Sequence, residues 1–385
     1  MQQAKPLTRP GSMVLDVIRF GAAIAVAVGH LSNPGFSSGW PYSKLLNVAT
    51  LAVAVFFVLS GFVIRLITAV RPTTARNYAL DRISRLYSIV LPALVFSVLA
   101  ALCLHFFPTA TVPAFPFSRA DVVPFFANLT FTGQIWGHDL LIRDNAVFWS
   151  LCYEAPFYVF WGLGFIPLRS WRWAAYIGFA LIVGPQILFM LPLWLLGCLV
   201  HDIYQRLRTQ NNAFRNLSAA LAVTSVLIVL LWQISQRYRH YLHGIAVKTG
   251  LVKIQQQWEI AHSHHILVNA STHYYLIGVP TGILMLWLLL LVDRWHQSFS
   301  PSVSMAVRTV ADGTFTLYLF HLPLFLLIVA YIPYDHGSTP QKILLLTVAT
   351  ALCVAVAVPL DALKRWMRAK LSIPGEASTQ VIQRS

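Results

Sequence analysis

The sequence predicts an all-α fold, a polytopic bundle of about ten membrane-spanning helices with both termini in the cytoplasm. Three observations lead to this prediction. The 385-residue chain is 57% hydrophobic and only 11% charged, whereas soluble domains are nearer 25% charged. Apolar stretches of about 17 to 25 residues recur along it, the length that a hydrocarbon layer of roughly 30 Å requires. The basic residues gather in alternate loops, as cytoplasmic loops demand.

Ten apolar stretches satisfy the length requirement. They are residues 13–33, 47–69, 83–106, 147–168, 172–186, 188–204, 216–235, 274–293, 309–332 and 343–363. The fifth and sixth are short and are separated around Gly184 and Pro185, so they could form one hairpin or a re-entrant pair. The first is interrupted by Asp16 and Arg19, which favours a retained span over a cleaved secretory signal.

The distribution of charge predicts the orientation. With the N-terminus in the cytoplasm, 19 of the 28 Lys and Arg residues fall on the inner side. Residues 1–12 then form a cytoplasmic leader, 13–363 a single transmembrane domain, and 364–385 a basic cytoplasmic tail with a polar, disordered end. Loops that face anionic lipid account for the net charge of +15, so we expect a lipid bilayer and no nucleic acid as partner.

Neither cysteine nor histidine patterns predict a metal or a disulfide. The four cysteines lie scattered inside predicted spans without a CxxC pair. The stretch AHSHHILVNASTH lacks the i, i+4 histidine pair of a helical zinc motif, so an interfacial loop is the better interpretation. The residues concerned are Cys103, Cys152, Cys198 and Cys353, and His262, His264, His265 and His273.

The first span carries two ionisable side chains on one stripe. Arg19 and His30 stand eleven residues apart in LDVIRFGAAIAVAVGH, which on a helix returns both to nearly the same face, roughly 16 Å apart along the axis. Ionisable groups inside a bilayer are costly enough to suggest a functional site. The alternative is that Arg19 pairs with Asp16 at the inner interface while His30 reaches the outer one.

Two further patterns lie in the second and third spans. Ser60 and Gly61 in AVAVFFVLSGFVIRL favour close helix packing over a nucleophilic serine, because no GxSxG turn surrounds Ser60. Arg82 and Arg85 stand three apart at the inner mouth of the third span. They could anchor the span by charge or form a phosphate clamp, and the absence of Lys from the stretch favours the clamp.

The fourth and ninth spans each carry an ionisable residue where lipid is expected. Glu154 follows Trp149 and Ser150 and would lie roughly 10 Å below the outer surface, where a carboxylate must be paired or neutralised. His321 in DGTFTLYLFHLPLF falls near mid-bilayer, followed by Pro323. A lone buried histidine is usually a packing residue, but three outlying ionisable groups could converge here.

Five of these motifs together resemble the integral-membrane acyltransferase 3 family. LDVIRFGAAIAVAVGH, FFVLSGFVI, LDRISRLY, FWSLCYE and TFTLYLFHLP occur in the family's order between about residue 13 and residue 363. The resemblance places the family's Arg and His signature on Arg19 and His30, its inner arginines on Arg82 and Arg85, its acidic motif on Glu154 and its late histidine on His321. The chain departs from many members at Ala155 and Pro156, where a second acid is missing, and at Ser88, which replaces a proline.

The resemblance implies an acyl-CoA-dependent O-acyltransferase of the inner membrane, if the source is bacterial. The donor would be acyl-CoA, with acetyl the default and succinyl or longer chains open. The acceptor would be a sugar hydroxyl of a surface polysaccharide, lipopolysaccharide or exported oligosaccharide, which could be lipid-linked.

On that interpretation each site residue has a role. Arg82 and Arg85 would bind the coenzyme phosphates, and His30 would act as general base or as a transient acyl acceptor. Glu154 or His321 would orient that base or bind the acceptor, and Arg19 would steady the thioester. A flippase or permease is the alternative class, but the sequence shows no inverted repeat and no paired broken helices.

Overall fold

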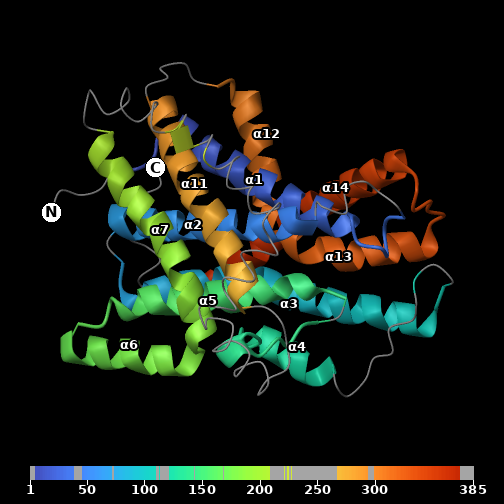
Figure 1. Ribbon diagram of the computed structural model, residues 1–385, viewed down its shortest axis with the longest axis horizontal. Coiled ribbons are helices and arrows are strands. Elements are labelled where there is room, and N and C mark those ends of the chain that lie inside the picture. Colours follow the sequence, from blue (N-terminus) through green and yellow to red (C-terminus); the bar gives the residue numbers. More distant parts are fainter. Residues whose placement is uncertain are drawn as a thin grey trace.

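A computed structural model of the chain describes residues 5–38, 46–71, 73–109, 121–142, 144–167, 169–208, 267–293 and 299–372, with positions 112, 221, 223, 224 and 227. Every regular element among these residues is a helix, and the helices pack into one bundle (Figure 1). The predicted all-α membrane fold is therefore confirmed at this level.

Seven helices of the described residues are long and apolar enough to cross a membrane. They are α1 (Arg9–Leu31), α2 (Leu46–Val70), α3 (Ala75–Phe106), α7 (Pro185–Leu207), α11 (Leu267–Asp293), α13 (Thr314–Tyr331) and α14 (Thr339–Leu371). Each corresponds to one predicted span. Of the predicted span 216–235 only positions 221, 223, 224 and 227 are among the described residues, so the span as a whole lies outside the described part.

The remaining elements are shorter than a bilayer is thick. They are α4 (Val122–Leu129), the 3-10 turns η3 (Ile135–Gly137) and η4 (Ala146–Ser150), α5 (Leu151–Leu163), α6 (Arg169–Val183) and α12 (Pro301–Asp312). The fourth and fifth predicted spans correspond to α5 and α6, whose 13 and 15 residues rise only about 20 Å and 22 Å. The ninth predicted span is divided, because Gly313 separates α12 from α13.

The predicted break between the fifth and sixth spans is confirmed. Helix α6 ends at Val183, α7 begins at Pro185, and Gly184 between them has φ +79°. A side chain rarely adopts that conformation, and a Cβ on Gly184 would also lie 2.9 Å from the Cα of Trp136. Glycine is required at this corner on both counts.

Local sequence signals start several of the helices. Thr8, Thr74, Ser300 and Ser338 precede α1, α3, α12 and α14, and each side chain accepts a hydrogen bond from a backbone N–H of the first turn. These contacts satisfy donors that have no partner inside the helix. Proline within the first two positions, which needs no such partner, begins α1, α7, α12 and α14.

Helix α1 lies between two groups of helices. Helix α2 packs against α1, α7 and α11, while α13 packs against α1, α3 and α14 (Figure 1). The closest approach is between α2 and α7. A Cβ on Gly61 would lie 1.9 Å from the carbonyl oxygen of Trp194, and one on Gly197 would lie 1.9 Å from that of Val58. Gly61 thus serves the close packing that its motif predicts.

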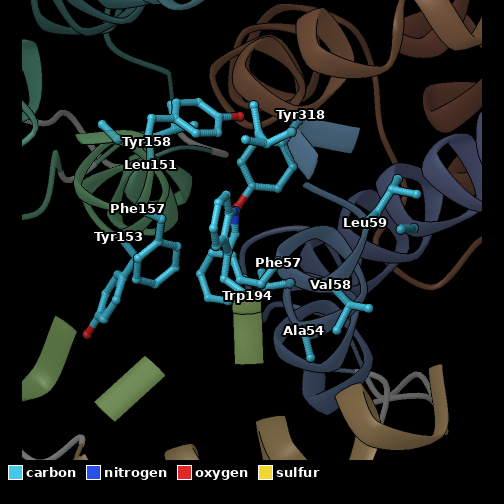
Figure 2. Packing of buried hydrophobic residues seen from close by; sticks show 14 of the residues in the cluster. Ala54, Phe57, Val58, Leu59, Leu151, Tyr153, Phe157, Tyr158, Trp194 and Tyr318 are labelled. Atoms are coloured by element: carbon cyan, nitrogen blue, oxygen red, sulfur yellow. The ribbon is translucent and has the colours of Figure 1, made fainter. Parts of the chain in front are cut away.

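Aromatic side chains fill the space where α2, α5 and α7 meet. The rings of Phe57 and Phe157 lie 5.5 Å apart edge to face, and Phe157 lies 6.0 Å from Trp194. Tyr158 and Tyr318 belong to the same buried cluster, and each carries a hydroxyl group (Figure 2). Aromatic pairs at these separations add to the stabilisation from burial alone, so the three helices have a firm common core.

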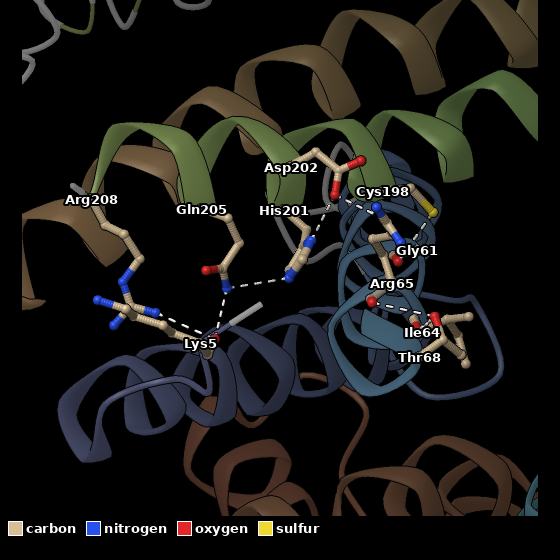
Figure 3. Close-up of polar contacts among 10 residues, drawn as sticks. All are labelled: Lys5, Gly61, Ile64, Arg65, Thr68, Cys198, His201, Asp202, Gln205 and Arg208. Atoms are coloured by element: carbon tan, nitrogen blue, oxygen red, sulfur yellow. Dashed lines mark hydrogen bonds and ion pairs between the residues drawn. The ribbon is translucent and has the colours of Figure 1, made fainter. Parts of the chain in front are cut away.

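Charged and polar side chains connect α7 to α2 and to the residues before α1 (Figure 3). The Arg65 guanidinium lies 2.8 Å from an Asp202 carboxylate oxygen, and His201 Nδ1 lies 3.0 Å from the same oxygen. Gln205 donates to the carbonyl oxygen of Lys5 at 2.8 Å. We call the end of the bundle that carries Lys5 and Arg65 the basic end.

The basic end is tied to α11 as well. Asp293 accepts hydrogen bonds from Tyr204 at 2.6 Å and from the capping residue Thr8 at 2.7 Å. Arg208 lies 3.3 Å from the same carboxylate. One acid of α11 therefore holds the starts and ends of three helices in register.

Candidate active site

A cavity of about 80 Å³ lies between α1, α2, α3, α5 and α13. Its charged lining residues are Arg19, Arg82, Arg85 and Glu154, which come from three different helices. Sequence reasoning selected these four separately, and the fold brings them to one cavity. Four charged groups around one cavity inside an apolar bundle are the arrangement expected of a functional site.

Glu154 is held in the cavity by hydroxyl groups. Its Oε1 atom accepts a hydrogen bond from Ser60 at 2.6 Å and another from Tyr158, one helical turn further along α5. Trp194 Nε1 in turn donates to Ser60 Oγ at 3.2 Å. The donors to the acid thus come from α2 and α5, and α7 supports the first of them. This chain of donors stabilises a carboxylate that lipid alone could not accommodate.

The motif around Ser60 predicted a packing role, and only the structure shows its contact with Glu154. The motif of Ser60 contains no signal for this contact, since Glu154 lies 94 residues away. Tyr158 was detectable in principle, because its i, i+4 spacing from Glu154 places both on one face of a helix.

The two arginines of α3 lie at the wall between two spaces. Arg82 and Arg85 line the cavity and also a larger hollow of about 670 Å³ that opens at the basic end. The Arg82 guanidinium lies 5.9 Å from the ring centre of Tyr78 and 5.7 Å from that of Tyr158. Within the described part of the chain, no acceptor meets its buried Nε atom. Because aromatic rings contact this guanidinium without accepting its hydrogen bonds, its N–H donors stay available to an anion.

Arg19 occupies both of the positions that the sequence left as alternatives. It lines the cavity, and its guanidinium lies 3.7 Å from the carboxylate of Asp16, one turn earlier in α1. The ion pair and the site position are therefore compatible. Asp16 compensates part of the positive charge that three arginines bring to this region.

His30 and His321 contact each other. Their ring centres lie 5.3 Å apart, so the imidazole of His30 faces α13. His321 is fully buried, and its Nδ1 donates to the carbonyl oxygen of Leu317 at 2.8 Å, because a carbonyl only accepts. Its Nε2 then carries the lone pair. Among the described residues neither this atom nor the buried His30 Nδ1 has a hydrogen-bond partner.

The histidine pair does not line the cavity. Tyr318 connects the histidine pair to the cavity. It lies one turn before His321 on α13 and lines the cavity. The Tyr318 hydroxyl is 2.6 Å from that of Ser150, another lining residue. Of the six predicted site residues, four surround the cavity and two form a pair beside it on the same helices α1 and α13.

Asn145 is a buried site neighbour that sequence reasoning missed. Pro323 has no N–H, so it leaves the Leu319 carbonyl without its usual partner in α13. Asn145 Nδ2 donates to that carbonyl at 2.8 Å and to Ser97 of α3 at 2.9 Å. Pro323 in the sequence indicates that the Leu319 carbonyl needs a donor from outside α13, but it does not identify Asn145 as that donor. Asn145 thereby fixes the turn that carries His321.

No metal site is evident among the described residues, where no group of three or more His, Cys, Asp or Glu side chains could hold an ion. The side chains at 262–265 and 273 lie outside the described part. The four cysteines are free thiols.

Comparison with known proteins identifies the family. A family model described as an acyltransferase domain matches residues 14–361, which is most of the chain. No curated protein and no solved structure gives a significant match. The matched region includes the cavity, the histidine pair and all seven long helices for most of their length. The chain therefore belongs to the acyltransferase 3 family and is a multi-pass membrane acyltransferase.

Proposed function

We propose that this protein transfers an acyl group, by default acetyl, from acyl-CoA to a sugar hydroxyl of a surface polysaccharide, lipopolysaccharide or exported oligosaccharide. The position of Arg82 and Arg85 carries the proposal, because the pair borders both the hollow at the basic end and the cavity inside the bundle. A donor with an anionic head and an extended thioester arm fits such a boundary, since guanidinium groups bind phosphates in two-pronged fashion.

We place the basic end in the cytoplasm, where acyl-CoA is made and where basic loops are retained. The donor then enters from the cytoplasmic side and the acceptor from the opposite side of the bilayer. If the source is bacterial, this bilayer is the inner membrane. A transferase whose two substrates come from opposite sides of a bilayer needs helices that cross it.

His30 is the proposed base. It would take the proton of the acceptor hydroxyl while the oxygen attacks the thioester carbonyl carbon. The tetrahedral intermediate would then break its C–S bond, and the thiolate would take the proton from the imidazolium to leave as the free thiol. In the alternative route, a His30 nitrogen attacks the thioester carbonyl carbon, the C–S bond breaks, and the thiolate leaves as the free thiol with the proton of the imidazole. The sugar oxygen then attacks the acyl-imidazole, the C–N bond breaks, and the imidazole takes the proton of the hydroxyl.

The other residues would support this step. His321 contacts His30, so we assign His321 the role of orienting the His30 base. Glu154 contacts Ser60 and Tyr158 instead, which leaves it to bind donor or acceptor within the cavity. Arg19 lines the cavity, where it would steady the thioester arm of the donor.

Substitution of His30 tests the proposal. We expect His30→Ala to lower acetyl transfer from radiolabelled acetyl-CoA by at least about 10²-fold, the low end for removal of a general base. His105→Ala is the matched control, because His105 is exposed at the far end of α3 and distant in sequence from every site residue. The purified variants should share one thermal unfolding midpoint.

Retained transfer by His30→Ala would remove that residue from the mechanism. A parent protein that leaves the thioester intact while moving a glycan or lipid precursor would instead be a flippase or permease. The acceptor itself is found by mass spectrometry of surface glycans from a strain lacking the chain, as the loss of an acyl mass increment.

A further inference from the structure

The hollow at the basic end is larger and more basic than the cavity beyond it. Its volume of about 670 Å³ lies within the roughly 300–1,000 Å³ typical of small-molecule sites, whereas the cavity holds about 80 Å³. Among its lining residues six are basic and one, Asp81, is acidic. The six are Arg71, Arg82, Arg85, Lys364, Arg365 and Arg368. Half of this charge comes from α14, for which the sequence analysis predicted no part in the site.

Helix α14 reaches the hollow because it is longer than a bilayer. Its 33 residues rise about 50 Å, some 20 Å more than the hydrocarbon layer. The surplus turns include Lys364, Arg365 and Arg368 and project beyond the lipid at the basic end.

Arg368 fastens this extension to α3. Its Nε lies 2.5 Å from the Asp81 carboxylate, and another of its nitrogens donates to Asn77 at 3.2 Å. Arg368 is therefore engaged with α3, and Asp81 is engaged with Arg368. The wall of the hollow is held in place without any ligand.

Lys364 and Arg365 differ from Arg368 in their partner. Both pair with Asp361, an acid of their own helix, and their side chains are 43% and 67% exposed. Exposed pairs of this kind contribute little to stability. Two cations thus share one acid at the rim of the hollow and can turn toward an incoming anion at small cost.

We propose that the hollow binds the nucleoside phosphates of the acyl donor, with Lys364 and Arg365 contacting the phosphate farthest from the thioester. Arg82 and Arg85 would contact the phosphates nearest the arm, which passes between them into the cavity. This inference rests on the proposed function and assigns α14 a part in choosing the donor. It predicts that the protein distinguishes coenzyme A thioesters from those lacking the 3′-phosphate.

Donor kinetics in phosphatidylcholine bilayers test this. We expect Lys364→Gln and Arg365→Gln each to raise the KM for acetyl-CoA by about 10-fold, or about 1.4 kcal/mol, since each variant removes one charged contact with the phosphate. The KM for 3′-dephospho-acetyl-CoA and both kcat values should stay unchanged. Lys370→Gln is the matched control, because it removes the same charge from the same helix end without lining the hollow.

Binding of adenosine 3′,5′-bisphosphate, measured by calorimetry without turnover, provides an independent readout. The two variants should weaken it by a similar factor, and Lys370→Gln should not. Equal effects of all three variants, or equal effects on both donors, would overturn the inference. So would an effect that requires anionic lipid, because the charges would then serve the membrane surface.

The failure of the inference and that of the proposed function are distinguishable. If the parent uses acetyl-CoA but Lys364→Gln and Arg365→Gln behave as Lys370→Gln does, only the role of α14 fails. If the parent neither binds the bisphosphate nor consumes acetyl-CoA, both fail together.

Discussion

Asn145 connects three parts of the chain through one amide group. It is fully buried, lies just before η4, and donates to Ser97 of α3 and to Leu319 of α13. The second contact satisfies the carbonyl that Pro323 leaves free, one turn from the histidine pair. The Asn145 amide therefore stabilises the fold and also positions the turn of α13 that carries His321.

Replacement of this amide separates the two effects. We expect Asn145→Asp to cost about 1–3 kcal/mol of unfolding free energy, because two buried acceptors lose their donor, and to lower kcat with an unchanged KM for acetyl-CoA. Asn128→Asp is the control: Asn128 is also buried and donates to Pro124 and Leu140, away from α13. It should lower the thermal unfolding midpoint and leave kcat unchanged. Equal kcat values for the two variants would contradict a positioning role.

Asp144, the neighbour of Asn145, makes stability depend on pH. Burial raises the pKa of its carboxyl group to about 6, and nearby Asp121 acts in the same direction. Its Oδ2 atom has no hydrogen-bond partner among the described residues. A group whose pKa is higher in the folded state destabilises that state as pH rises from its unfolded pKa, near 3.9, to its folded one.

The expected result is a gain of stability on removal of this acid. Asp144→Asn should raise the free energy of unfolding at pH 7.5 by at most about 3 kcal/mol, at roughly 1.4 kcal/mol per pKa unit, and with it the thermal midpoint. The gain should shrink as pH falls from 6 toward 4. Thermal unfolding of both proteins across this range measures it, and a gain that is constant with pH would contradict the assignment.

At the scale of elements, the contact between α2 and α7 positions the site. Gly61 follows Ser60, which binds Glu154, and Gly197 follows Trp194 by three residues. Because each glycine touches backbone of the opposite helix, the two axes approach closely enough for Trp194 to reach Ser60. The hydrogen bonds of Glu154 thus depend on glycine at both positions, because a Cβ at either one would separate the helices.

A methyl group at this crossing should force the helices apart. We expect Gly197→Ala to destabilise the protein by at least about 1–3 kcal/mol, the usual cost of overpacking, and to reduce activity by disturbing Ser60 and Glu154. Gly178→Ala on α6 is the control, because a Cβ there would meet nothing within 4 Å. That change should be neutral or stabilising, since alanine is the better helix former. Similar unfolding midpoints for the two variants would refute the argument.

Helix lengths show where reasoning from the sequence reached its limit. Hydropathy located the seven long helices, since burial in lipid depends on the composition of each segment. It extended the fourth span over residues 147–168, although the chain begins there with the 3-10 turn η4 and α5 ends at Leu163. Apolar composition does not distinguish an α-helix from a 3-10 turn. It also passed over the break at Gly313.

At the scale of the whole molecule, the site depends on α1 and its place between two groups of helices. Arg19 at the middle of α1 meets the cavity that α2, α3, α5 and α13 complete, and His30 in the last turn of α1 meets His321. One helix therefore serves both parts of the site. The orientation of the bundle in the bilayer stays a prediction from its charges.

Sequence alone determined that the chain is a helical membrane protein of the acyltransferase 3 family, because hydropathy, helix starts and short motifs are local properties. Only the tertiary structure decided which polar groups meet: Glu154 with Ser60, His30 with His321, Asn145 with Leu319. The physical reason is that membrane helices are apolar nearly all round. Their rotation and depth are set by packing against neighbours, which no periodicity within a single helix encodes.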